Sequence, residues 1–308
     1  MTDRPVIPSG WVLVDKSVGI TSAQVVRNLK RILNLPRSVR IGHGGTLDPF
    51  ASGLLPVAVG EACKVVSYVL AGDKGYDFTL RFGEKRSSGD PEGMVVATCD
   101  RIPKEEAIIE TLPQFTGRIE QTPPARSAIK IGGKRAYTYA REGKSVTIPK
   151  REVVIHRLDF LGMEGRDARF SVRCSKGSYI RSLGEDIAEA IGSLGYLNTL
   201  RRIFAEPFHI EDSISLDKCK QLMQDQTLGE FLLPFKAGLA DIPVLPISSR
   251  QSAALQRGQR LTGLLQSPDV HLATCADIPI ALVAQDLATG AMRILRNFNL
   301  WKGVDDVD

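Results

Sequence analysis

The sequence has little that would place the protein in a membrane or carry it across one. Its longest apolar stretch, residues 54–70, is interrupted by Glu61 and Lys64. A membrane-spanning helix needs roughly 20 residues free of such charges. The first residues, MTDRPVIPSG, lack a basic segment followed by an apolar one, so we expect no signal peptide. These absences predict a cytoplasmic protein that has no membrane partner.

Cysteine and histidine are also scarce, and they are dispersed along the chain. The five cysteines include no Cys-x-x-Cys pair. An odd number at wide intervals is typical of free thiols in a reducing compartment. The four histidines are equally scattered, so the clustering expected of metal ligands is missing. We therefore expect no metal site and no cofactor.

Positive charge is present in two blocks, although the net charge is only +5. Residues 27–40 hold five basic and no acidic residues, and residues 126–151 hold eight basic residues against Glu142 alone. Such blocks are the electrostatic signature of a phosphate-rich partner. A charge run by itself more often forms a solvated face, so both interpretations stay open at this point.

The first half of the chain has the periodicities of strands and helices in succession. A strand at 11–14 is followed by a helix that Thr21 or Ser22 caps and Pro36 ends. Residues 36–53, rich in glycine and proline, are predicted to form a loop. The other predicted segments are a strand at 55–59, a helix at 61–70, a strand at 76–82 and a helix beginning at Pro103.

The order of the predicted elements indicates an α+β fold with a mixed, largely antiparallel sheet, because strands come in adjacent runs rather than in alternation with helices. Two strands at 153–160 and 168–174 precede a helix at 180–191. Residues 239–246 are interpreted as a hinge to a small β-rich domain. In that domain we expect a helix at 248–257 and strands at 259–262, 280–287 and 292–298.

The most unusual segment is GHGGTLDP at 42–49, in which Asp48 precedes a proline. Glycines let the backbone approach a ligand closely, and a residue before proline is held extended. A carboxylate fixed in this way can act as a nucleophile or a general base. A purely structural turn is the equal alternative. A phosphate-binding P-loop is not indicated, because no Gly-Lys-Ser/Thr follows.

Five motifs in order resemble the TruB family of tRNA pseudouridine synthases. The segment GHGGTLDP, with ASGLLPVAVGEACK at 51–64, is similar to the catalytic motif of that family. The other similar segments are DKSVGITS at 15–22, Gly75-Tyr76, CSKGSYIRSLGEDI at 174–187 and LRRIFAEPF at 200–208. The resemblance implies a pseudouridine synthase fold in residues 1–242 and a PUA-like RNA-binding domain in residues 243–308.

The resemblance also implies a reaction and a role for each matched residue. The enzyme would isomerise uridine 55 in the T-loop of tRNA, with Asp48 as the nucleophile on a flipped-out nucleotide. Tyr76 would stack on the base and move a proton, and Arg181 would pair with Asp48. The other implied pocket residues are Tyr179 and Leu200 as lining, His43 inserted into the T-loop, and Lys16 and Lys64 as positive charge.

Without the resemblance, these residues have plainer interpretations. A tyrosine on an alternating strand, such as Tyr76, is usually core, and Arg181 is usually an ion-paired surface group. Leu200 is usually packing, and His43 a turn residue. Three other functions are alternatives. A tRNA-folding chaperone is also compatible with an active enzyme. The insertion at 121–151 argues against a guide-RNA-directed relative, and the scattered histidines and the absence of a second carboxylate argue against a metal-dependent hydrolase.

The basic block at 121–151 resembles a thumb-like insertion that grips the T-arm of tRNA. Its implied phosphate contacts are Lys130, Lys134, Arg135 and Arg141. This insertion favours an enzyme that needs no protein partner and acts as a monomer on the T-arm stem-loop. Three places depart from the family pattern: Arg126 replaces an aromatic residue, Ser17 replaces a proline, and residues 86–90 replace a threonine-rich segment in which Asp90 is kept.

Overall fold

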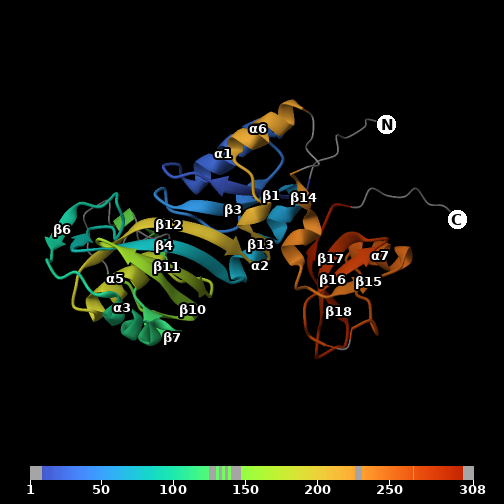
Figure 1. Cartoon of the computed structure of the whole chain (residues 1–308). Helices are drawn as coiled ribbons and strands as arrows, with labels where there is room; N and C mark the ends of the chain where they lie inside the picture. The colour runs from blue at the N-terminus through green and yellow to red at the C-terminus, as the bar shows by residue number, and fades with distance from the viewer. Residues whose placement is uncertain are drawn as a thin grey trace.

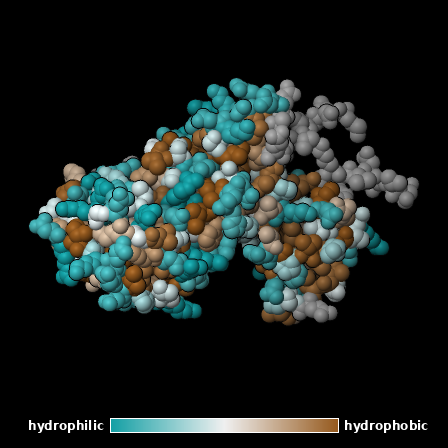
Figure 2. Space-filling model, in the orientation of Figure 1, coloured by the Kyte–Doolittle hydropathy of each residue, from teal (hydrophilic) through white to brown (hydrophobic). Residues whose placement is uncertain are grey.

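The computed structural model describes residues 9–124, 130–131, 134–135, 138–139, 147–225, 231–265 and 267–300. It shows a large α+β part and a smaller module at the C-terminal end, side by side (Figure 1). Most strands of the large part form one sheet, and its helices pack against that sheet. Figure 2 shows a notch in the molecular surface between the two parts.

The large part is built on a ten-stranded mixed sheet. Most neighbouring strands are antiparallel, while the contact between residues 201–202 and 52–53 is parallel. The sheet follows the order β14 (Leu233–Pro234), β1 (Gly10–Lys16), β3 (Ser52–Val59), β12 (Gly195–Ala205), β4 (Lys74–Phe82), β11 (Asp167–Cys174), β10 (Arg151–Glu164) and β7 (Gly117–Gln121), with β2 (Ile41–His43) beside β3 and β13 (Phe208–His209) beside β12.

Helices cover both faces of the sheet around β1 and β3. On one face, helix α1 (Ser22–Ile32) packs beside α6 (Leu216–Gln224), and Val25 and Leu29 are fully buried there. Helix α1 begins with a capping box between Thr21 and Gln24, as the sequence predicts for its start. The other face carries η1 (Gly60–Lys64), α2 (Val66–Ala71) and η5 (Phe235–Leu239), which enclose Trp11.

The remaining strands have one covered and one exposed face. Phe78 and Leu80 of β4 point to a core shared with α5 (Ile180–Ala190), α3 (Glu105–Thr111) and η2 (Leu112–Phe115). Thr79 of β4 hydrogen-bonds Thr199 of β12 on the exposed face. A hairpin of β5 (Glu84–Arg86) and β6 (Val95–Thr98) follows β4, and β8 (Lys130–Ile131) pairs with β9 (Lys134–Arg135).

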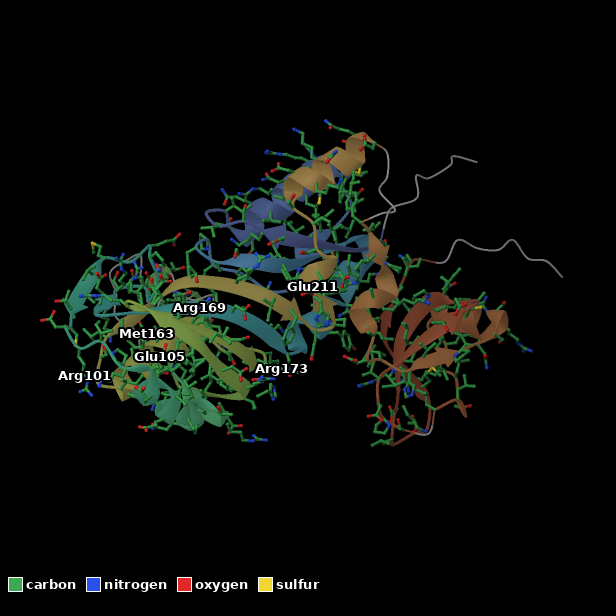
Figure 3. The ribbon with its side chains drawn as sticks, in the orientation of Figure 1. Arg101, Glu105, Met163, Arg169, Arg173 and Glu211 are labelled. Carbon is green, nitrogen blue, oxygen red and sulfur yellow. The ribbon has the colours of Figure 1, made fainter. Side chains whose placement is uncertain are left out.

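The C-terminal module holds a four-stranded sheet in the order β15 (Val244–Pro246), β16 (His271–Cys275), β17 (Ile278–Gln285) and β18 (Met292–Asn297), with helix α7 (Ser249–Gln256) beside it. This module contacts the large part through aromatic side chains: the ring centroids of Phe298 and Phe235 are 4.6 Å apart. In Figure 3, Arg173 and Glu211 mark the end of the large part that faces this module, while Arg101, Glu105, Met163 and Arg169 lie farther from it. The predicted domain boundary at 242/243 stays a prediction.

Several predicted segments are corrected. Residues 36–53 are not all loop, because β2 forms and β3 already begins at Ser52. The helix expected at 61–70 is a 3-10 turn and a short α-helix that meet at Val65. The hinge ends early, because residues 244–246 pair with β16. The strand expected at 259–262 is reduced to one bridge between Thr262 and Ala291.

Candidate active site

Asp48 lies in a loop that hydrogen bonds hold at both ends. The amide of Gly44 donates to Pro56 O at 2.7 Å, and Ala51 N donates to Asp48 O at 3.1 Å. Between them, the buried Ser22 hydroxyl bonds both the amide and the carbonyl of Leu47 at 2.9 Å. Gly45 adopts a φ of +130°, a region that side chains other than glycine rarely occupy. The loop therefore presents the carboxylate of Asp48 in one fixed place.

Asp48 lines a cavity of about 590 Å³. Four cationic side chains and one carboxylate are among the residues that line it. The structure brings six of the predicted site residues together in this lining: His43, Asp48, Tyr76, Tyr179, Arg181 and Leu200. A cavity of this volume is within the usual range for a small-molecule site.

Arg181 connects Asp48 to a second carboxylate, that of Asp90. Its Nε lies 3.0 Å from Asp48 Oδ2, and its Nη1 lies 3.2 Å from Asp90 Oδ2 and 2.9 Å from Ser88 O. The side chains of Arg181 and Asp90 are only 4% and 5% exposed, whereas that of Asp48 is 35% exposed. Asp48 is therefore accessible from the cavity, while the buried Asp90 holds the guanidinium of Arg181 on the side away from it.

The environment of Asp48 makes its carboxylate more basic than that of an exposed aspartate. Burial raises the pKa of Asp48, and the negative charge of Asp90 adds to this effect. The positive charges of Arg181 and Lys16 oppose the rise without cancelling it. A carboxylate with a raised pKa binds a proton, or attacks an electrophilic carbon, more readily than a fully solvated one.

Tyr76 and Arg202 lie side by side across two strands. They are register partners in the antiparallel pair of β4 and β12, and both line the cavity. The Arg202 side chain is almost completely buried, and its Nε donates to Leu54 O at 2.7 Å. Burial raises the pKa of the Tyr76 phenol, and the charge and hydrogen bond of Arg202 partly oppose this rise.

Tyr179, at the N-terminus of α5, is held by the side chains of Gln121 and Arg151. The buried amide of Gln121 accepts from Tyr179 N at 2.9 Å and donates to Tyr179 O at 3.1 Å. The guanidinium carbon of Arg151 lies 4.6 Å from the centroid of the Tyr179 ring, which is within cation–π distance. Gln121 and Arg151 are themselves register partners on β7 and β10. This aromatic wall of the cavity is therefore fixed before any ligand binds.

Lys16 supports the loop of Asp48 from outside the cavity lining. Its Nζ donates to Ser17 O, Ile20 O and Pro49 O at 3.0, 2.8 and 3.3 Å. The side chain is 1% exposed, and burial lowers the pKa of Lys16 to about 8, against the opposing charge of Asp48. The ammonium thus ties the polar loop after β1 to the residue that follows Asp48.

His43 and Lys64 are in different positions relative to the cavity. His43 lines it, and its Nδ1 is a buried atom without a hydrogen-bond partner among the described residues. Burial lowers the pKa of His43, and the nearby charge of Arg202 lowers it further. Lys64 is not in the lining: its Nζ lies 2.6 Å from Glu61 Oε2 and 3.0 Å from Asn297 O of the C-terminal module.

The predicted phosphate contacts of the basic block cannot be placed. Residues 130–131 and 134–135 are described as strands β8 and β9, but not their side chains, and Arg141 lies outside the described residues. Within the described residues, no group of three or more potential ligands is arranged to hold a metal ion. None of the helices described is both long and apolar enough to cross a bilayer.

Sequence reasoning missed Asp90 and Arg202 as site residues. Asp90 lies 91 positions from Arg181 along the chain, and Arg202 lies 148 and 157 positions from its acceptors Leu54 and Gly45. Such partners are set by strand pairing and cannot be found from local spacing. Both residues nevertheless lie in segments that were compared with the family pattern, Asp90 in residues 86–90 and Arg202 in residues 200–208, so their position there was the available signal.

Two solved structures share this architecture. The crystal structure of a Cbf5-Nop10-Gar1 complex matches with a TM-score of 0.70 and 28% identity, covering 91% of this chain and 80% of that chain. The structure of an H/ACA RNP bound to a substrate RNA containing 2'-deoxyuridine matches with a TM-score of 0.72 and 26% identity, covering 96% and 87%. The fold is therefore that of the pseudouridine synthases, with a PUA-like C-terminal module.

A family model described as TruB family pseudouridylate synthase (N terminal domain) matches residues 30–180. Three relatives are each called tRNA pseudouridine synthase B. Those of Zymomonas mobilis and Novosphingobium aromaticivorans are 44% identical over 293 and 298 residues, covering 94% of this chain and 96% and 97% of theirs. That of Sinorhizobium medicae is 40% identical over 306 residues, covering 96% of each. The chain belongs to the TruB family of pseudouridine synthases.

Proposed function

We propose that this protein converts uridine 55 in the T-loop of tRNA to pseudouridine, with Asp48 as the nucleophile. The observation that carries the proposal is the Asp48 carboxylate, held by Arg181 at 3.0 Å and opening into a cavity that Tyr76 also lines. The relatives named tRNA pseudouridine synthase B support tRNA as the substrate. The T-arm and the single position within it follow from the family motif.

The reaction is an isomerisation, so no atom is gained or lost overall. Asp48 attacks the flipped-out nucleotide, and the bond between N1 of uracil and C1' of ribose breaks. The uracil turns within the cavity, a bond forms between C5 and C1', and the bond from the nucleotide to Asp48 breaks, which restores the carboxylate. C5 then loses its proton while N1 gains one. Tyr76, which lines the cavity, gives its phenol proton to N1, and the resulting phenolate accepts the proton from C5. Aspartate and tyrosine side chains are suited to these two roles.

The charges around the cavity fit an RNA substrate. A nucleotide brings a phosphate on each side, and the lining offers Lys74, Arg151, Arg181 and Arg202. The cost of flipping a base, a few kcal/mol, must be offset by contacts of this kind and by stacking. We propose that residues 1–242 hold the catalytic site, that the thumb-like block at 121–151 and the PUA-like module at 243–308 bind the tRNA, and that no protein partner is needed.

The test is tritium release from tRNA transcript labelled with 5-³H-uridine, using purified protein alone. We expect release by the wild type, none by D48N, and wild-type release by the control D100N, whose aspartate is exposed and does not line the cavity. Mapping of the product identifies the modified position. Release by D48N at the wild-type rate would refute the role of Asp48. Absence of release by the wild type would refute the proposed function itself.

A further inference from the structure

Arg202 is a buried cation without a carboxylate partner in the described part of the chain. Its side chain is 1% exposed, yet it takes part in none of the ion pairs found among those residues. Its neighbour Arg201, on the opposite face of β12, makes two hydrogen bonds to Asp15 at 3.0 and 2.8 Å. An uncompensated buried charge is costly for stability, and such costs are concentrated at functional sites.

Two backbone carbonyls fix the plane of the guanidinium. Arg202 Nε donates to Leu54 O at 2.7 Å, and Nη2 donates to Gly45 O at 3.0 Å. A Cβ added to Gly45 would lie 3.3 Å from Nη1, so the glycine leaves room for this approach. Leu54 belongs to β3, and Gly45 belongs to the loop of Asp48. Arg202 therefore joins β12 to two other parts of the active site.

Arg202 is paired with Tyr76 across two strands, and both residues line the cavity. The two residues are directly opposite each other in the pair of β4 and β12. Directly opposite side chains in an antiparallel pair have Cβ atoms about 5 Å apart and interact. The charge and hydrogen bonding of Arg202 also act on the pKa of the Tyr76 phenol, so a guanidinium fixed at two carbonyls lies beside the phenol.

We propose that Arg202 is a positioning residue for Tyr76: it holds the phenol oxygen where the proton of C5 arrives, at a fixed place relative to the loop of Asp48. This inference rests on the proposed function, because it assigns Tyr76 the proton of C5. Arg202 acts through Tyr76 and does not itself take part in bond making. Lysine cannot replace it, because one ammonium cannot reach both carbonyls and the phenol with fixed geometry.

The matched experiment compares R202K with R201K in single-turnover reactions on tRNA. We expect R202K to lower the rate about tenfold or more, which is within the range of coupling between residues in contact. The dissociation constant for tRNA should stay within about twofold, since lysine keeps the positive charge at this position. R201K should leave both values unchanged. In a Y76F background, R202K should lower the residual rate less than about twofold, because the group on which it acts is already gone.

A second readout separates positioning from a loss of folded protein. With tRNA deuterated at C5 of uridine, R202K should show a larger primary isotope effect than wild type and R201K, because removal of the C5 proton becomes slower. An isotope effect is a ratio within one preparation, so the fraction of folded molecules cancels. An unchanged isotope effect, or equal losses from R202K in the wild-type and Y76F backgrounds, would overturn this inference alone. An inactive wild type would overturn the proposed function and this inference with it.

Discussion

Replacement of Asp90 by asparagine tests how the row of Asp48, Arg181 and Asp90 works. The side chains of Arg181 and Asp90 are 4% and 5% exposed, so D90N removes one member of a buried ion pair. Such a removal costs about 3–5 kcal/mol. We expect the lower end of this range, because Arg181 keeps Asp48 as a second partner at 3.0 Å. About 3 kcal/mol corresponds to a fall in Tm of about 6–12 °C for a domain of roughly this size.

D90N should also change the pH dependence of the reaction in a direction that simple damage would not produce. Burial raises the pKa of Asp48, and the charge of Asp90 contributes to that rise. Removing this charge lowers the pKa of Asp48, so the acid limb of the rate profile should move to lower pH. The rate on the plateau should fall, because Arg181 is no longer held from behind.

The assay is the single-turnover rate of tritium release between pH 4.5 and pH 8 for wild type, D90N and the exposed control D100N, together with thermal unfolding of each. The reasoning fails if D90N melts like the wild type, since the pair would then contribute nothing to the fold. It also fails if the acid limb stays in place or moves to higher pH, since Asp90 would then not act on the charge of Asp48.

Three further predictions concern charge. The wild-type rate should fall at acid pH with a midpoint above 3.8, the ordinary pKa of an aspartate, because burial raises the pKa of Asp48; a midpoint at or below 3.8 would contradict this. Burial lowers the pKa of Lys16 to about 8 from 10.5, so the unfolded chain binds more protons between these values. The free energy of unfolding of wild type relative to K16M, measured in urea, should therefore rise by up to about 3 kcal/mol over that window, and a flat difference would refute it. Affinity for tRNA should fall at least about a hundredfold between 50 and 200 mM salt, because several phosphates are neutralised; filter binding that shows little change would exclude such a basic interface.

The sequence best predicted the elements in which buried and exposed positions follow one regular period along the whole length. Helix α1 has its cap at Thr21, and its buried positions, such as Val25 and Leu29, recur with helical period. Strand β11 alternates between exposed and buried residues in the regular way. In both cases local propensity and burial agree, so the pattern of apolar residues was sufficient.

The longest missed strand was β12, and the reason is chemical. Its segment Gly195–Ala205 places Leu200 and Arg202 on the face that lines the cavity, and Arg201 on the exposed face. A buried arginine beside an ion-paired one removes the alternation of apolar and polar residues by which a strand is recognised. Strand β2 was missed for a different cause: its three residues are all half-buried and give no period.

The same reasoning explains why Asp48 could be predicted as a site residue and its supports could not. A carboxylate between glycines and a proline is unusual in any local context. Asp90 and Arg202 are ordinary in sequence and become unusual only once the tertiary fold buries them. Four cationic side chains and one carboxylate line the cavity. The hydrophobic effect alone does not favour such an arrangement, which is typical of a functional site. We infer that the excess of positive charge is balanced when a polyanion occupies the site, so the buried charges that cost the free protein stability favour the proposed RNA substrate.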